Sequence, residues 1–312
     1  MKEQMTKSQA GRGRRLNPQI KKSLPLYVFL LPAIIYLILF NYVPIYGVQI
    51  AFKNFSSKAG IWGSPWVGLD HFAKFIKSPN FTLLLKNTFV LGIYTLATFP
   101  CAIIFALMVN EVRNTKFKKS VQMISYMPHF LSTVVVCAML KLFFHPTSGV
   151  INMIIQALGG TGQDFMTVPE YFADIYVWSG VWQQIGWNSI IYISALAGVS
   201  SELVEAAEVD GAGRLGVIWH VYIPSILPTI AIMLILSCGN VLSVGFEKVF
   251  LMQNSLNLSA SQVISTYVYE IGLKGGQFSY SSAIGLFNNV ISVVLIGVVN
   301  WITKKLTGSG IW

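Results

Sequence analysis

The chain has 312 residues, of which 54% are hydrophobic and only 11% are charged, with a formal net charge of +10. A soluble domain normally carries about 25% charged residues, so this composition excludes an ordinary soluble domain and indicates a membrane protein with several spans. The basic residues lie in short blocks beside apolar segments, which is a topology signal and argues against nucleic-acid binding.

Six apolar runs are long enough to cross a bilayer, because a helix needs about 20 apolar residues to cross about 30 Å of hydrocarbon. An all-α polytopic membrane protein with six transmembrane helices is therefore predicted. The first run is too long for the core of a cleaved signal peptide. The predicted spans are residues 26–49, 82–109, 121–144, 172–197, 225–244 and 281–302.

The basic residues are distributed unequally across this arrangement. With the N-terminus inside, the inner segments hold fourteen of the 22 Lys and Arg residues and the outer loops hold six, while Lys86 and Lys141 lie near the outer ends of spans. Because basic segments stay on the cytoplasmic side, we expect both termini to be cytoplasmic. We expect a basic tail over residues 1–25, a transmembrane domain over 26–303 and a short tail over 304–312.

Smaller features accompany the spans. Pro128 is expected to kink the third span, because proline cannot donate the helical hydrogen bond. His129 follows it with no second ligand nearby, and the three cysteines lie in apolar runs, so no metal site is predicted. A short helix is expected over residues 150–158. Glu247 and Lys248, just beyond the fifth span, are expected to form a solvated ion pair.

The segment of residues 200–228 is a polar insert between the fourth and fifth spans. Ser200 is a candidate N-cap, and Glu205 lies in the first turns, where acids favour the positive end of a helix. Gly211 is expected to end this helix because glycine adopts positive φ. A second helix follows over residues 215–222, and Pro224 and Pro228 set the start of the fifth span. On residues alone, the segment is either an ordinary amphipathic loop or a cytoplasmic docking surface.

The same segment resembles the EAA signature of ABC importer permeases in order and spacing. Other motifs along the chain are similar to carbohydrate-uptake permeases of the maltose-transporter type, and more narrowly to polysaccharide and complex-oligosaccharide permeases. The signature residues are Glu205-Ala206-Ala207, Asp210-Gly211-Ala212 and Ile223-Pro224, and the other motifs are Leu30-Leu31-Pro32-Ala33, YVPIYGVQIAF at 42–52, Asn87-Thr88, Met127-Pro128 and WNSIIY at 187–192.

This resemblance implies a coupling helix that docks into a cytoplasmic ATPase. It also implies a second homologous permease, an ATPase dimer, an extracellular solute-binding protein and an oligosaccharide substrate, all at the plasma membrane of a bacterium. The chain has no phosphate-loop motif, so no cofactor is expected in it, and ATP and Mg²⁺ would bind the partner ATPase. The expected coupling residues are Glu205, Ala206, Ala207, Asp210, Gly211, Ala212 and Pro224.

Polar side chains inside the spans are candidates for a substrate path, because such groups usually face a cavity or another helix. Gln184, Asn188 and Tyr192 follow an i, i+4, i+8 spacing and share one helix face. Rings and neutral amides match the C–H faces and hydroxyls of sugars. An aromatic belt and hydrogen bonds between helices are the alternatives. The candidates are Trp182, Gln183, Gln184, Trp187, Asn188, Tyr192, Asn240, Asn288 and Asn289.

Three other functions compete with an oligosaccharide permease. An ion- or proton-coupled secondary transporter would need ionisable residues inside the spans, and these are scarce. An importer permease for a non-sugar solute has the same architecture. A membrane enzyme is disfavoured because no paired acids or nucleophile–base set lies near a membrane face.

Overall fold

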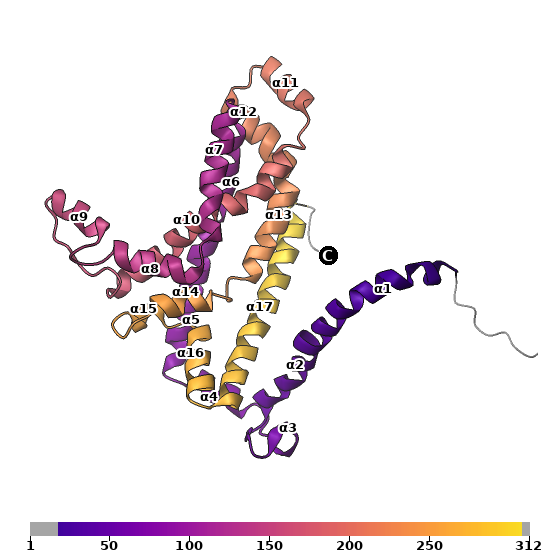
Figure 1. The fold of residues 1–312 in the computed structure, drawn as a ribbon, viewed down its shortest axis with the longest axis vertical. Helices are drawn as coiled ribbons and strands as arrows, with labels where there is room; N and C mark the ends of the chain where they lie inside the picture. Colours follow the sequence, from indigo (N-terminus) through magenta and orange to yellow (C-terminus); the bar gives the residue numbers. More distant parts are fainter. Residues whose placement is uncertain (1–17, 308–312) are drawn as a thin grey trace, which may run out of the picture.

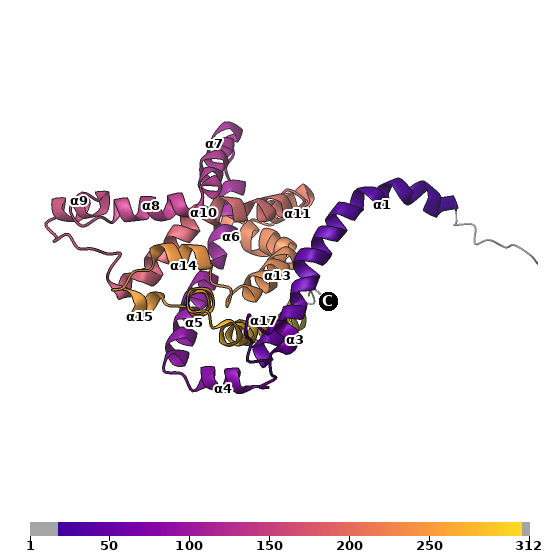
Figure 2. The ribbon, with the colours of Figure 1, turned by 60° about the horizontal axis from the view of Figure 1, so that its bottom comes forward.

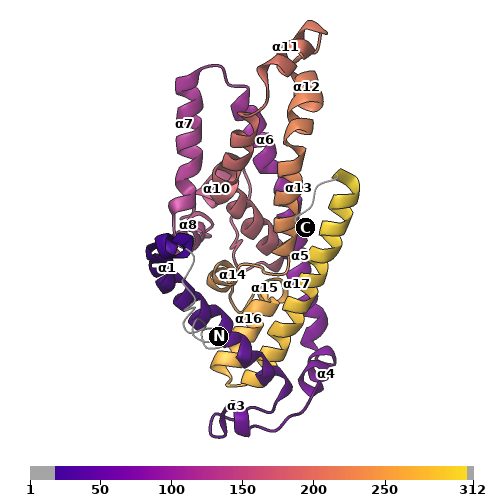
Figure 3. The same ribbon diagram turned by 90° about the vertical axis from the view of Figure 1, so that its right-hand side faces the viewer.

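The computed structural model describes the backbone of residues 18–307 and the side chains of residues 26–305. Over that range the regular secondary structure is helical, joined by turns and loops, with one isolated bridge between Lys53 and Trp66 (Figure 1). Residues 1–17 and 308–312, which include most of the two expected tails, lie outside the described residues. The bundle is elongated, with α11 (Ser201–Val209) at one end and α3 (Gly60–Gly63) and α4 (Asp70–Ile76) at the other (Figures 1 and 3).

The described helices agree with a six-span membrane protein. Four of them are each long and apolar enough to cross a bilayer, namely Leu26–Phe52, Asn80–Asn110, Arg214–Gly239 and Phe278–Lys305. Two bent pairs of helices also qualify when each pair is taken together, which gives up to six spans. The prediction of an all-α polytopic fold is confirmed, although several span boundaries differ.

Most of the first span stands apart from the bundle, while its last turn packs against α17 (Phe278–Thr307) and α4. Helix α1 (Pro18–Leu37) continues through a π-turn (Ile38–Tyr42) and α2 (Val43–Ile45) into a 3-10 turn (Tyr46–Phe52). Residues 18–25 were expected to belong to the tail but are helical. None of the most apolar stretch of this span is buried (Figures 1 and 2).

The third span, predicted over 121–144 with a kink, is sharply bent in the structure and begins earlier, at Thr115. Helix α7 (Thr115–Tyr126) and a 3-10 turn (Met127–Phe130) meet α8 (Thr133–Phe143) at 99°. The break follows Pro128, where the expected kink lies, and Ser132 caps α8 by accepting a hydrogen bond from the backbone N–H of Val135. Helix α9 (Val150–Ala157), close to the short helix expected there, extends this arm away from the bundle (Figure 2).

The fifth span is a longer helix than expected and begins earlier. Helix α12 (Arg214–Val217), a π-turn (Ile218–Tyr222) and α13 (Ile223–Gly239) are continuous, so the predicted start at 225 and end at 244 are both wrong. Pro224 lies in the first turn of α13, directly after the π-turn. A π-turn shifts the hydrogen-bond register by one residue, which allows the helix to pass the missing N–H of a proline.

The fourth span, α10 (Pro169–Leu196), is the central helix of the bundle and turns by 78° into α11. It packs against α6 (Phe99–Asn110), α7 and α13. A Cβ added at Gly186 would lie 2.2 Å from the carbonyl oxygen of Ser125 in α7, so only glycine permits this close approach. The remaining helices are α5 (Asn80–Ala97), α14 (Phe246–Met252), α15 (Leu258–Ser261), α16 (Ile264–Tyr269), a π-turn (Glu270–Lys274) and α17 (Phe278–Thr307).

Candidate functional site

The segment of residues 200–228 forms the projecting end of the molecule (Figure 1). The side chain of Ser200 accepts a hydrogen bond from the backbone N–H of Glu202, which caps α11 as expected. At the other end of α11, Gly211 has φ +85°. The backbone N–H groups of Gly211 and Ala212 donate to the carbonyls of Glu208 and Ala207, which is a Schellman motif. The helix–turn–helix prediction is therefore confirmed, with the second helix starting at Arg214.

Six of the seven expected coupling residues lie together at this end. Ala207 and Ala212 are half-buried, and the other four are exposed. Pro224 is exposed too, but it lies farther along the chain in α13. The turn also exposes apolar side chains, with Val209 at 87% and Leu215 at 72%. Exposed apolar side chains that gather at one projecting turn mark a candidate interaction surface.

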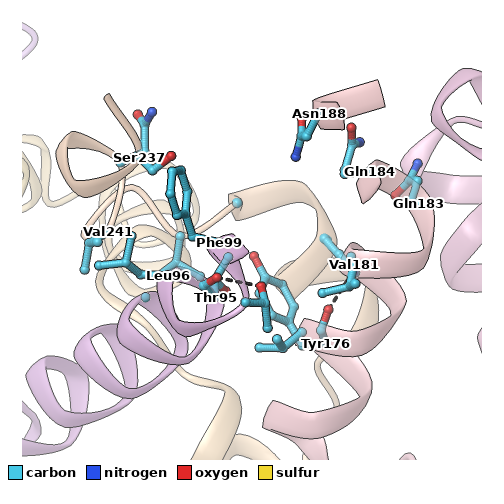
Figure 4. A pocket seen from close by; sticks show the side chains of 18 of the residues that line it. Thr95, Leu96, Phe99, Tyr176, Val181, Gln183, Gln184, Asn188, Ser237 and Val241 are labelled. Carbon is cyan, nitrogen blue, oxygen red and sulfur yellow. Dashed lines mark hydrogen bonds between the residues drawn. The ribbon is translucent and has the colours of Figure 1, made fainter. Parts of the chain in front are cut away.

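A cavity of about 630 Å³ lies between α5, α6, α10, α13 and the segment that follows α13. Five of the expected path residues line it, four from α10 and one from just beyond the end of α13. Figure 4 shows the α10 amides across the cavity from Thr95, Phe99 and Ser237. The five predicted residues are Gln183, Gln184, Asn188, Tyr192 and Asn240.

The two glutamines also hold the bend of the third span. Gln183 donates from Nε2 to the carbonyl oxygen of Leu131 at 2.9 Å. The Oε1 atom of Gln184 lies 2.8 Å from Nδ1 of His129, so an N–H at Nδ1 donates to it. These residues therefore both line the cavity and connect α10 to α7 and α8, as the helix-to-helix alternative proposed.

The two tryptophans of the prediction do not line this cavity. Trp187 stacks on His129 with ring centroids 4.1 Å apart and an angle of 2° between the planes. Trp182 lines a separate, largely apolar hollow of about 550 Å³ between α8 and α10, together with Trp178. For these residues the structure supports packing rather than a direct place beside the cavity.

The asparagines of the fifth and sixth spans differ from one another in position. Asn240 lines the cavity but lies just beyond the end of α13 rather than within it. Asn288 donates from Nδ2 to the carbonyl of Leu242 at 3.2 Å, which is a contact between segments. Asn289 is exposed, and neither it nor Asn288 lines the cavity.

Lys248 in α14 lines the cavity, which sequence reasoning missed. Its ammonium donates to the carbonyl of Tyr176 in α10 at 2.7 Å instead of pairing with the neighbouring Glu247, so the expected ion pair is not the contact that forms. Burial lowers the pKa of Lys248 to about 8. Nothing in the local sequence indicated a contact with a residue 72 positions away.

Comparison with known proteins gives consistent matches over most of the chain. Residues 98–308 match the family described as "Binding-protein-dependent transport system inner membrane component". The chain is similar to Protein LplB of Bacillus subtilis (strain 168), with 41% identity over 304 residues that cover 97% of this chain and 96% of the relative. It is 43% identical over 288 residues to the polygalacturonan/rhamnogalacturonan transport system permease protein YteP of the same organism, covering 92% and 90%.

Among solved structures, the chain is similar to a chain of a bacterial alginate ABC transporter. That crystal structure is of the transporter in complex with an alginate pentasaccharide-bound periplasmic protein. The TM-score is 0.87 and the identity 37%, over 95% of this chain and 100% of the other. A second structure, of a bacterial ABC transporter involved in the import of the acidic polysaccharide alginate, gives a TM-score of 0.86 and 38% identity, over 93% and 98%.

Proposed function

Because the chain belongs to the family of binding-protein-dependent transport system inner membrane components, we propose that it is the permease subunit of an ATP-driven importer of oligosaccharides. An extracellular binding protein delivers the sugar to the cavity. A separate ATPase, which binds ATP and Mg²⁺, acts on the bundle through residues 200–228. The exposed, capped turn at the end of α11, with the EAA spacing, is the observation that carries this proposal.

The cavity has the chemistry that a sugar requires. Its polar groups are mainly neutral amides and hydroxyls, from residues such as Asn188, Thr95 and Ser237, beside the rings of Phe99 and Tyr176. Amides and hydroxyls hydrogen-bond sugar hydroxyls, and aromatic faces cover C–H surfaces. The relatives are named for transport of polygalacturonan, rhamnogalacturonan and alginate, which are polysaccharides. These points together support an oligosaccharide as the substrate.

The exposed turn supports coupling to an ATPase. Glu205 and Asp210 present carboxylates, while Val209 presents an apolar side chain, all from one projecting end. The helix α10 joins this end directly to the cavity residues, so a push on α11 reaches the substrate path through one helix. Movement of the turn thereby alternates access to the cavity.

Two uncovered surfaces of the chain support a second permease subunit as its partner. The most apolar stretch of the first span is uncovered by its own chain, whereas the 3-10 turn at its end packs against α17. The cavity is also partly open rather than enclosed, and a second, homologous subunit completes its wall. We place this assembly in the plasma membrane of a bacterium with both termini cytoplasmic, since most basic residues then lie inside.

The proposal is tested with Glu205→Lys in cells that express the whole transporter. ATPase recovery with the purified permease and uptake of labelled oligosaccharide are measured together, with Glu170→Lys, an exposed acid at the other end of α10, as the matched control. We expect loss of both readouts in the first variant only. Uptake that persists without the ATPase and collapses with a proton uncoupler would instead favour a secondary transporter.

A further inference from the structure

Lys248 is the only basic residue among the described residues that line the cavity. It lies next to Tyr176 and Gly180 of α10, whereas Tyr192, nearer the projecting turn, lines the opposite part of the cavity. Sixteen residues of helix separate Tyr176 from Tyr192, which is about 24 Å at 1.5 Å per residue. The ammonium is therefore at the end of the cavity farthest from residues 200–228.

The neighbours of Lys248 hold the ammonium in one place. The amine donates to the carbonyl of Tyr176 at 2.7 Å and lies 4.8 Å from the centre of that ring. A Cβ added at Gly180 would lie 3.3 Å from Nζ, so the glycine leaves space for the amine beside α10. The charge is thus fixed at the cavity wall rather than carried on a freely moving side chain.

This ammonium has unused capacity to bind an anion. An ammonium has three donors, and the one hydrogen bond that it makes within the described part of the chain uses a single donor. Three ionisable groups lie around it: Cys137 from α8, Tyr176 from α10 and Glu247 from its own helix. Glu247 is exposed and lines the same cavity, but its carboxylate makes no ion pair with Lys248, whose amine donates to the carbonyl of Tyr176 instead. Burial with little compensation therefore lowers the pKa of Lys248. A carboxylate from a ligand would offset that cost.

We propose that the ammonium of Lys248 binds the carboxylate of an acidic sugar residue, and so makes the cavity selective for oligosaccharides that contain uronate units. This inference rests on the proposed function and specifies its substrate class. A neutral sugar of the same shape leaves the ammonium without its anion. Charge-assisted hydrogen bonds are stronger than neutral ones, so the preference contributed by Lys248 is about tenfold to a hundredfold.

The test compares a uronate oligosaccharide with the same oligosaccharide after chemical reduction of its carboxyl groups. Transport of each is measured in proteoliposomes that contain the complete transporter and loaded binding protein. The variants are Lys248→Met and Lys248→Arg. Lys53→Met is the matched control, because Lys53 also donates to a backbone carbonyl, that of Ile61 at 2.7 Å, but does not line the cavity.

We expect Lys248→Met to reduce transport of the acidic oligosaccharide at least tenfold, with Lys248→Arg and Lys53→Met close to wild type. Transport of the reduced oligosaccharide should fall much less than transport of the acidic one, so the ratio of the two rates is the readout. Equal losses on both sugars, or an unchanged acidic rate in Lys248→Met, overturn the inference and leave the proposed function intact. If the wild type transports only the carboxyl-reduced oligosaccharide, the inference is likewise overturned and the proposed function stays intact. No ATP-dependent transport of any glycan overturns the proposed function itself.

Discussion

The side-chain oxygen of Gln184 lies 2.8 Å from Nδ1 of His129, so that the residue lining the cavity and the residue at the bend of the third span share one hydrogen bond. The same imidazole stacks on Trp187. This contact of His129 with Gln184 and Trp187, called the joint below, holds the bend between α7 and α8 against α10. It also sets the position of a cavity amide.

Removal of this joint should loosen the bend. His129→Ala loses a hydrogen bond, worth about 0.5–1.5 kcal/mol, and a stacked ring pair of similar value. We expect the purified complex to melt several degrees lower and uptake to fall, because Gln184 loses its partner. Met127→Ala, in the same 3-10 turn, removes an exposed side chain and serves as the comparison. Equal melting temperatures for His129→Ala and wild type would contradict the joint.

Close packing of α10 on α7 gives a second prediction. Gly186→Ala places a methyl group 2.2 Å from a backbone oxygen, so the helices must separate, at a cost of about 1–3 kcal/mol. Gly285→Ala in α17 meets nothing within 4 Å and gains helix propensity. Thermal unfolding should therefore be lowered in the first variant alone. Similar unfolding curves would mean that α7 and α10 are not in contact at Gly186.

The turn after α11 gives a third prediction. Gly211→Val puts a β-branched residue at φ +85°, which costs at least about 1–2 kcal/mol locally and disrupts the Schellman motif. We expect normal membrane insertion but a loss of sugar-stimulated ATPase activity. Gly213 has φ −73°, in the region open to all residues, so Gly213→Ala should behave as wild type. Full stimulation in Gly211→Val would separate the turn from coupling.

The cavity asparagines give a fourth prediction. Asn188 lines the cavity, whereas Asn289 is exposed and lies elsewhere. Asn188→Ala should raise the KM for uptake about two- to tenfold, as expected for one lost hydrogen bond, and Asn289→Ala should leave KM unchanged. Radiolabelled uptake at several sugar concentrations measures both. The reverse order of effects would place the path on α17 instead of α10.

The lowered pKa of Lys248 gives a prediction for pH. A lysine is charged below its pKa, so the ammonium is lost as pH rises through about 8 rather than near 10.5. Uptake of a uronate oligosaccharide, divided by uptake of its carboxyl-reduced form, should fall over that range. Lys248→Arg should remove the fall, because guanidinium stays charged. A constant ratio from pH 7 to 9 in the wild type would contradict the prediction.

Local sequence predicted the coupling segment well because its signals are local. A cap at Ser200 and a glycine at 211 determine where α11 begins and ends, and neither depends on distant residues. The apolar runs likewise predicted the membrane spans. The spacing of Gln184, Asn188 and Tyr192 on α10 placed them on one face, which is the face that lines the cavity.

The features that the sequence did not predict depend on contacts between distant parts of the chain. Pro128 indicated a kink, but the 99° bend depends on contacts with α10 that the local sequence does not display. Two prolines suggested a late start for the fifth span, whereas the π-turn before Pro224 lets the helix continue. The sequence suggests an ion pair between Lys248 and its neighbour Glu247, whereas the amine of Lys248 donates to the backbone carbonyl of Tyr176.

The uncovered first span has a consequence for biogenesis. Its apolar side chains gain no hydrophobic free energy when they move from lipid tails to another helix, because lipid tails are as apolar as leucine. The most apolar stretch of this helix therefore needs no protein cover inside the bilayer. If the proposed second permease covers this face, insertion of the chain and assembly of the transporter are separate events, and the two subunits meet as chains that already lie in the membrane.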